Sequence, residues 1–138
     1  MNNEIKMIFP NKSCNERLAR SIVSAFVLDL DPTAEQLAEL KTAVSEAVTN
    51  AIIHGYKDME GDVILECEAD DRTVYITVRD NGRGIENIEK AMEPLYTGSP
   101  ETERSGMGFT IMEAFTDEIN VSSVVGKGTV IRMKKCFS

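Results

Sequence analysis

Three polar side chains recur at helical spacing between residues 45 and 55. Glu46, Asn50 and His54 are four residues apart, so in an α-helix they project from one face. The amide oxygen of Asn50 suits a Mg²⁺ ion that already carries phosphate oxygens and waters, and Glu46 can accept a proton or orient a nucleophile. A solvated helix face with one buried histidine accounts for the same spacing about as well.

A second run of interest is D-N-G-R-G-I, from Asp80 to Ile85. Asp80 stands at the end of an expected strand, where its carboxylate can accept a hydrogen bond from an exocyclic amine such as that of adenine. Gly82 and Gly84 let the backbone turn sharply and approach a planar ligand. An ordinary turn from strand to loop uses the same residue types.

A glycine pair precedes an expected helix in the run R-S-G-M-G-F, from Arg104 to Phe109. Free N–H groups at the positive end of a helix favour phosphate, although a flexible loop entering a helix has the same composition. Gly128 and Thr129 open the last expected strand, where the hydroxyl bonds a base or caps a turn. His54 is the only histidine, which excludes metal clusters built from several histidines.

A first helix is expected over residues 13–29. Ser13 and Glu16 form an S-x-x-E capping signal at its start. Its apolar residues recur at helical spacing and predict the face that meets the core, which comprises Leu18, Ile22, Ala25 and Phe26.

A second, longer helix is expected over residues 32–54 and carries Glu46 and Asn50. Asp31 is the predicted N-cap, with Pro32 at the first helical position, and Gly55 is the stop signal. Its apolar stripe lies roughly opposite the two polar side chains and consists of Leu37, Leu40, Val44, Ala47, Val48, Ala51 and Ile52.

The remaining elements are strands in hairpins and short helices. Alternation and turn residues predict strands at 5–9, 62–69, 73–80, 118–124 and 128–136, a helix at 107–115 and one helical turn within 86–92. Alternation also places Val74, Ile76, Val78 and Asp80 on one face. The order predicts an α+β sandwich, with helices on one face of a mixed, mostly antiparallel sheet.

Composition narrows the class of protein. The 138 residues fit a single domain, 1–138, and 42% hydrophobic with 28% charged residues is ordinary for a globular protein. We find neither a bilayer-spanning apolar run nor a secretory signal, so a cytoplasmic location is expected. A net charge of −8 argues against direct nucleic-acid binding. Three widely separated cysteines are expected to be reduced thiols, and partners are expected to be proteins.

The ordered set E-x-x-x-N, D-x-G-x-G, G-x-G and G-T resembles the GHKL superfamily of ATP-binding domains, over nearly the whole chain. The runs S-E-A-V-T-N-A-I-I-H-G-Y and E-R-S-G-M-G-F-T-I-M look like the bacterial anti-sigma factor serine kinases of sporulation. The resemblance implies a Bergerat-type sandwich and a homodimer that holds a sigma factor inactive. It also implies that ATP with Mg²⁺ is used to phosphorylate a serine on an anti-anti-sigma factor.

The same resemblance implies roles for individual residues. Glu46 would polarise the serine hydroxyl, Asn50 would bind Mg²⁺, and Glu16 and Arg20 would contact the sigma factor, although a surface ion pair explains their spacing as well. Residues 94–105 would form a lid, with Arg104 near the terminal phosphate or a partner. The residues expected at ATP or ADP are Asn50, His54, Asp80, Gly82, Gly84, Ile85, Arg104, Ser105, Gly106, Met107, Gly108, Phe109 and Thr129.

Two other functions remain open from the residues. The chain could bind ATP only as a conformational ligand and sequester a partner without phosphotransfer. It could also act as a separate catalytic domain of the histidine-kinase type, on an acceptor histidine supplied by another protein. A carboxylate at Glu46 favours phosphotransfer over simple binding, because a pure binder has little need for it.

Overall fold

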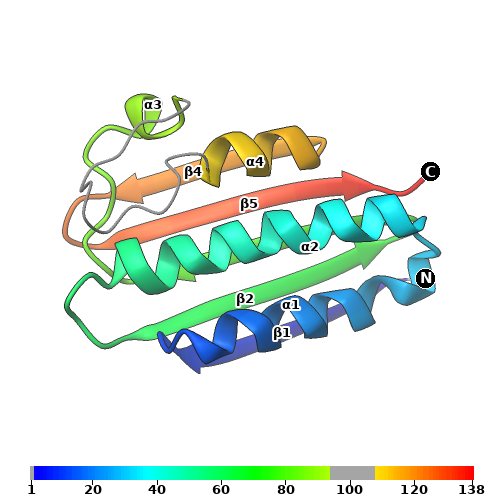
Figure 1. Ribbon diagram of the computed structural model, residues 1–138, viewed down its shortest axis with the longest axis horizontal. Helices are drawn as coiled ribbons and strands as arrows, with labels where there is room; N and C mark the ends of the chain where they lie inside the picture. The colour runs from blue at the N-terminus through cyan, green and yellow to red at the C-terminus, as the bar shows by residue number, and fades with distance from the viewer. Residues whose placement is uncertain (1, 94–107) are drawn as a thin grey trace.

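A single five-stranded sheet forms one layer of the protein (Figure 1). The computed structural model describes residues 2–93 and 108–138. The strands are β1 (Asn3–Pro10), β2 (Asp62–Asp70), β3 (Thr73–Asp80), β4 (Glu118–Val124) and β5 (Gly128–Cys136). Their order is β1-β2-β3-β5-β4, and the four neighbouring pairs are all antiparallel. The α+β sandwich expected from the sequence is thus confirmed, with a sheet that is antiparallel throughout the described residues where a mixed, mostly antiparallel one was expected.

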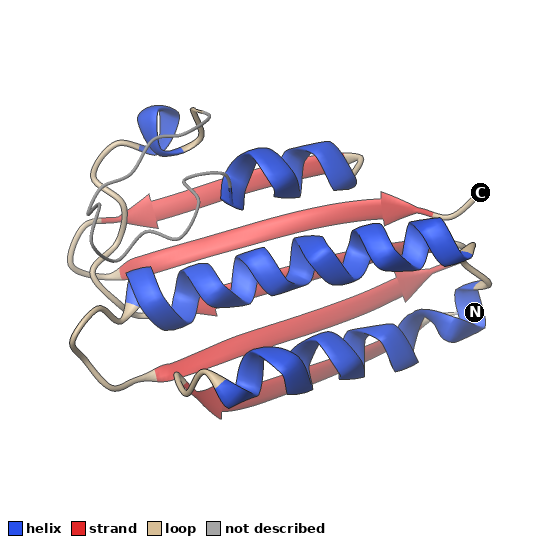
Figure 2. Ribbon diagram, viewed as in Figure 1, coloured by secondary structure: helices blue, strands red, loops and turns tan. Residues whose placement is uncertain are grey.

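Helices cover one face of this sheet (Figure 2). They are α1 (Cys14–Val27), α2 (Ala34–Thr49) and α4 (Gly108–Phe115), with α2 lying between the other two and packing against both. Shorter turns are the 3-10 helix η1 (Leu28–Leu30), the π-helix η2 (Asn50–Gly55) and α3 (Ile88–Ala91). No helix in the described ranges is long and apolar enough to cross a membrane.

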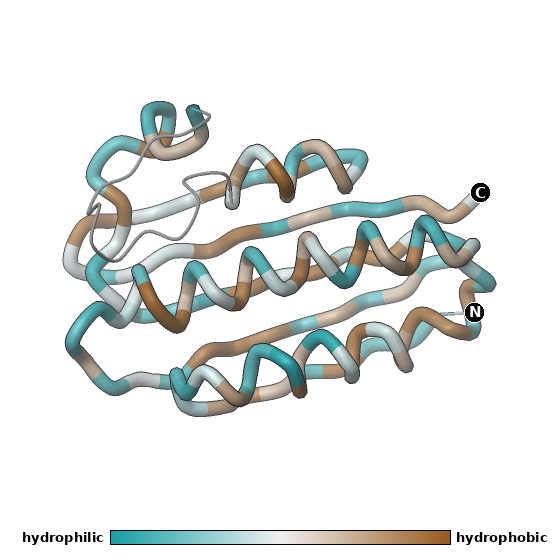
Figure 3. The backbone as a smooth tube through the Cα atoms, viewed as in Figure 1, coloured by the Kyte–Doolittle hydropathy of each residue, from teal (hydrophilic) through white to brown (hydrophobic). Residues whose placement is uncertain are grey.

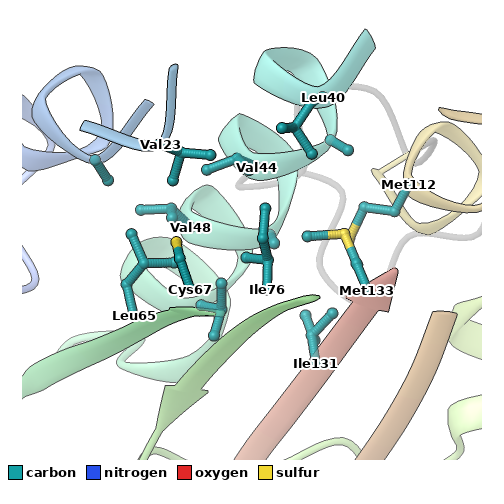
Figure 4. Close-up of a cluster of buried hydrophobic side chains, with 14 of the residues drawn as sticks. Val23, Leu40, Val44, Val48, Leu65, Cys67, Ile76, Met112, Ile131 and Met133 are labelled. Atoms are coloured by element: carbon teal, nitrogen blue, oxygen red, sulfur yellow. The ribbon is translucent and has the colours of Figure 1, made fainter. Parts of the chain in front are cut away.

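The core lies between the sheet and the helices. Along β3, Val74, Ile76, Val78 and Asp80 are all buried, as the alternation predicts. Leu40, Val44 and Val48 of α2 belong to one buried cluster with the valines and isoleucine of β3. Figure 4 shows these α2 side chains beside Ile76, and Met112 brings α4 into the same cluster. Along the chain the hydropathy changes within each helix and strand, as expected for elements with one buried face (Figure 3).

The buried face of α1 differs from the predicted one by about one position. Ala19, Val23 and Val27 are fully buried, whereas Leu18 is 49% exposed and Ala25 is exposed. Two apolar stripes run side by side on this helix, and the one made of small and β-branched side chains faces the core. Such side chains let the helix backbone approach its neighbours more closely than leucine would.

Both predicted helix starts need correction. Ser13 already has helical backbone angles and makes no side-chain cap, so the S-x-x-E signal is not realised. The long helix does not begin at Asp31 and Pro32 but after Thr33, whose hydroxyl accepts a hydrogen bond from the N–H of Gln36 at 3.1 Å. The Gln36 side chain accepts from the N–H of Thr33 in return, which completes a capping box.

Candidate functional site

Asp80 is the buried carboxylate at the end of β3. It is 3% exposed and lies directly opposite Thr129 of β5. The N–H of Gly82 donates to its Oδ1 at 2.9 Å, and the N–H of Thr129 also donates to the carboxylate. Burial raises the pKa of Asp80 above its ordinary value, and these two hydrogen bonds partly oppose that rise. An acceptor group is therefore held in a dry, fixed position.

Close backbone contacts enclose this carboxylate. A Cβ on Gly82 would overlap the carbonyl oxygen of Gly55, and a Cβ on Gly55 would lie 2.6 Å from Cγ of Asp80. The loop after β3 therefore touches the end of η2 without an intervening side chain. Arg83 stabilises this contact with two hydrogen bonds. Its backbone N–H donates to the Gly55 carbonyl and its side-chain Nε donates to the His54 carbonyl, each at 2.8 Å.

The predicted long helix changes its hydrogen bonding at Asn50. Regular α-helix ends at Thr49, and residues Asn50–Gly55 form the π-helix η2, which packs against the ends of β3 and β5. Glu46 and Asn50 keep the α-helical spacing, but the spacing that would align His54 with them is lost. π-helical turns are often found at functional sites. The helix over residues 32–54 is thus corrected to two segments, and His54 contributes its carbonyl to Arg83.

Glu46 faces the start of α4. Its Oε1 lies 3.4 Å from the position that a Cβ on Gly108 would occupy, so the carboxylate is within van der Waals range of the first residue of α4. Both Glu46 and Asn50 are half-buried on α2 and η2. The structure thus brings the Glu46 carboxylate to the first residue of α4, and Asn50 lies four residues further along, at the start of η2.

Ser123 joins β4 to the loop after β3 and was not identified from the sequence. Its hydroxyl accepts from the N–H of Ile85 at 2.7 Å and lies 2.9 Å from Oγ1 of Thr129. Nearby, Gly84 has a φ of 76° and packs against the carbonyl of Val124, where another residue would be strained. Alternation offered a signal, because Ser123 follows Ile119 and Val121 on the inward face of β4.

Tyr56 is a second supporting residue that sequence patterns did not indicate. Its ring is 4% exposed, its hydroxyl donates to the Asp62 carbonyl at 2.6 Å, and it accepts from the N–H of Asn81 at 2.7 Å. Burial is the main cause that raises the pKa of Tyr56. Because Asn81 directly follows Asp80, this bond fixes the exit of the chain from β3.

The predicted residues therefore separate into groups. The structure gathers Glu46, Asn50, Asp80, Gly82, Gly84, Ile85, Gly108 and Thr129 around the ends of α2, β3 and β5 and the start of α4. Phe109 is buried as part of the core. Arg104, Ser105, Gly106 and Met107, and the predicted lid at 94–105, lie outside the described residues.

A metal site formed by protein side chains alone is not present in the described ranges, where no group of three or more His, Cys, Asp or Glu side chains converges. Asn50 offers a hard amide oxygen, and this type of ligand fits Mg²⁺ that also binds phosphate and water. On α1, Nε of Arg20 lies 3.6 Å from Oε2 of Glu16, which confirms the expected i, i+4 ion pair.

Known proteins resemble this chain in sequence and fold. Residues 9–135 match the family described as Histidine kinase-like ATPase domain. The anti-sigma F factor of Clostridium perfringens strain SM101 is 58% identical over 136 residues, covering 98% of this chain and 97% of that protein. The anti-sigma F factor of Anoxybacillus flavithermus is 54% identical over 136 residues, covering 98% and 93%.

A solved structure, that of the RsbU and RsbW domains of Rv1364c from Mycobacterium tuberculosis, has the same fold. It matches with a TM-score of 0.69 and 19% identity, over 97% of this chain and 32% of that one. A sequence identity of 19% supports a common fold and no more. The anti-sigma F factors, in contrast, match this chain in both sequence and length. The chain, with Glu46, Asn50 and Asp80 arranged at one end of the sheet, belongs to the anti-sigma F factors within the histidine kinase-like ATPase family.

Proposed function

We propose that this chain is a single-domain protein serine kinase and anti-sigma factor, which binds ATP or ADP with Mg²⁺ at the end of the sheet. Asp80 would accept a hydrogen bond from the adenine amine, because it is a buried carboxylate held by two backbone N–H groups. Gly82, Gly84 and Thr129 would surround the base. The phosphates would extend toward Gly108, where N–H groups at the start of α4 favour negative charge.

The observation that supports phosphotransfer is the position of Glu46 beside Gly108. Asn50, four residues later, would supply an oxygen to Mg²⁺, and the metal would neutralise charge on the phosphates. Glu46 would accept the proton as the serine oxygen of an anti-anti-sigma factor attacks the γ-phosphorus. The bond from that phosphorus to the bridging oxygen breaks, and ADP leaves. Positioning and charge neutralisation suffice for such a transfer.

The proposed partners are a sporulation sigma factor and the serine-bearing anti-anti-sigma factor, both in the cytoplasm, with the chain acting as a homodimer. The first turns of α1 support a docking role. Oε2 of Glu16 is buried without a hydrogen-bond partner and lies 3.6 Å from Nε of Arg20. Leu18, between the two in sequence, is 49% exposed. A partner that supplies a hydrogen-bond donor to Glu16 would remove this deficit.

The test is transfer of label from radiolabelled ATP by wild type and by Glu46→Gln. Glu46→Gln is expected to keep nucleotide binding and to reduce serine phosphorylation by about 10²-fold or more, the usual range for a general base. Glu35→Gln is the matched control, because Glu35 is exposed in the first turn of the same helix. Unchanged transfer by Glu46→Gln contradicts the role of Glu46. Label on a histidine, or nucleotide binding without transfer, would favour the other two functions.

A further inference from the structure

Two carbonyl groups at the C-terminal end of η2 share one partner residue. The last carbonyl groups of a helix have no donors within the helix itself. At the end of η2 these include the carbonyls of His54 and Gly55, and Arg83 donates a hydrogen bond of 2.8 Å to each. The bond to Gly55 comes from the backbone N–H of Arg83, whereas the bond to His54 comes from Nε of its side chain. Only the second bond therefore depends on the type of residue at position 83.

The main chain of Arg83 is held on two sides. Its N–H donates to Gly55, and its carbonyl accepts from the N–H of Gly126, in the turn between β4 and β5, at 2.8 Å. Arg83 is exposed, and its Nε is nevertheless directed back to the His54 carbonyl. A fixed main chain with a directed side-chain donor makes this bond a geometric constraint between η2 and the loop that follows β3.

The bond to His54 connects the two halves of the proposed nucleotide site. The base half contains Asp80, three residues before Arg83, and the phosphate half contains Glu46 and Asn50, of which Asn50 begins η2. π-helical turns are rare, so the end of η2 depends on support from outside the helix. A ligand that engages both halves gains affinity when their separation is fixed beforehand, because binding then costs less ordering. A ligand that engages only the base half does not need this constraint.

We propose that Arg83 is a positioning residue, whose side-chain donor fixes the separation between the base half and the phosphate half of the site. The donor at Nε performs this role, and the positive charge of the guanidinium group is not needed for it. The role assigned to Arg83 rests on the proposed function, and it adds a residue outside the set expected at ATP.

Two substitutions separate the hydrogen bond from the charge. Arg83→Gln removes the charge but keeps an N–H donor at the position of Nε, since each nitrogen is bonded to Cδ. Arg83→Met keeps an unbranched side chain and removes both the donor and the charge. Dissociation constants are measured for Mg·ATP by calorimetry and for adenosine by displacement of ATP. Their ratio gives the gain in affinity that the phosphates and the metal add to adenosine.

The gain in affinity is the readout that tests the positioning role. In Arg83→Met it should fall by roughly 3- to 10-fold, the value of one net hydrogen bond. Adenosine affinity itself should stay within about 2-fold of wild type, because the backbone bond to Gly55 survives the substitution. Arg83→Gln should restore the gain to within about 2-fold of wild type, because it keeps the donor.

Two other roles for Arg83 make different predictions. If its charge acts directly on the phosphates, Arg83→Met and Arg83→Gln lose the same gain, and this result would overturn the inference. If Arg83 only stabilises the fold, adenosine and Mg·ATP weaken by the same factor and their ratio stays constant, which would also overturn it.

Arg132→Met is the matched control for the loss of charge. Arg132 is exposed on β5 between the buried residues Ile131 and Met133. This variant removes the same charge outside the site, and the gain in affinity is expected to stay at the wild-type value. Failure of wild type to bind either ligand would instead overturn the proposed function, and the role of Arg83 with it.

Discussion

Lys135 of β5 is a buried cation that ties α4 to α2. Its Nζ donates to the carbonyl of Phe115, the last residue of α4, at 2.8 Å and lies 3.2 Å from Oε1 of Glu39. The Lys135 side chain is 9% exposed and that of Glu39 is 32% exposed. A cation at the C-terminal end of a helix is also favoured by the helix dipole. Lys135→Met should keep the packing of the aliphatic part of the side chain, and it should remove both the hydrogen bond to Phe115 and the ion pair with Glu39.

The size of the effect follows from these contacts. A hydrogen bond to a charged group contributes about 1.5–3 kcal/mol. The two contributions do not add fully, because Glu39 is one-third exposed and water replaces part of its lost interaction. We therefore expect Lys135→Met to lower the free energy of unfolding by about 3 kcal/mol. For a domain of this length that corresponds to a fall in Tm of roughly 10 °C.

Thermal and urea unfolding of Lys135→Met, Glu39→Gln and the double variant measure this effect. The double-mutant cycle should give a coupling of about 1 kcal/mol, because Glu39 loses its partner only once. Lys134→Met is the control, since the neighbouring Lys134 is half-buried and its Nζ lies 6.0 Å from the ring centre of Tyr75. It should cost less than about 1 kcal/mol. Equal losses for the two lysine variants, or a cycle with no coupling, would show that the contacts of Lys135 do not stabilise the fold in this way.

Two further predictions concern ionisation. Burial raises the pKa of Asp80, so the folded protein holds the Asp80 proton more tightly than the unfolded chain does. The unfolding free energy of wild type relative to Asp80→Asn should therefore fall as pH rises through the native pKa of Asp80. ATP affinity should fall as pH drops through the same range, because the protonated carboxyl group is a poorer acceptor. Chemical denaturation and calorimetry from about pH 4 to about pH 7 test this, and a difference that does not change with pH would contradict it. Burial raises the pKa of Cys67 to about 12, whereas Cys14 is exposed and a hydrogen bond to Ser138 lowers the pKa of Cys136. Thiol reagents should therefore label Cys14 and Cys136 in the native protein and Cys67 only after unfolding, as mass spectrometry of the labelled peptides would show.

Strand periodicity predicted the sheet side of the site well. Val74, Ile76 and Val78 alternate inward, and continuing that alternation by two residues puts Asp80 at a buried position, as observed. The pattern works because successive side chains on a strand point to opposite faces, whatever the neighbouring strands are. In α1 periodicity was ambiguous, because Leu18 and Ala19 begin two apolar stripes that are about 100° apart on the helix.

Local backbone chemistry was harder to predict. Thr33 and Gln36 have the same T-x-x-Q spacing that makes a capping box, but Asp31 before Pro32 competes as an N-cap signal. Asp31 instead has a φ of 54° at the end of η1, where its carbonyl accepts from Arg72. That bond joins residues 41 positions apart, and contacts between distant parts of a chain have no signature in local spacing.

The π-helix η2 explains why the two halves of the site are held as one unit. Asn50 begins η2 and Gly55 ends it, while Arg83, in the loop that follows Asp80, bonds to both carbonyls at its end. In a regular α-helix through Gly55, residues 50–55 would be rotated about the helix axis relative to their positions in η2. The His54 and Gly55 carbonyls would then not face Arg83 as they do here. The proposed metal ligand and the proposed base acceptor are thereby joined through the main chain. The third part, the start of α4 beside Glu46, is positioned differently, because Lys135 holds that helix at its far end. Changes at Lys135 should therefore affect the phosphate side of the site more than its adenine side.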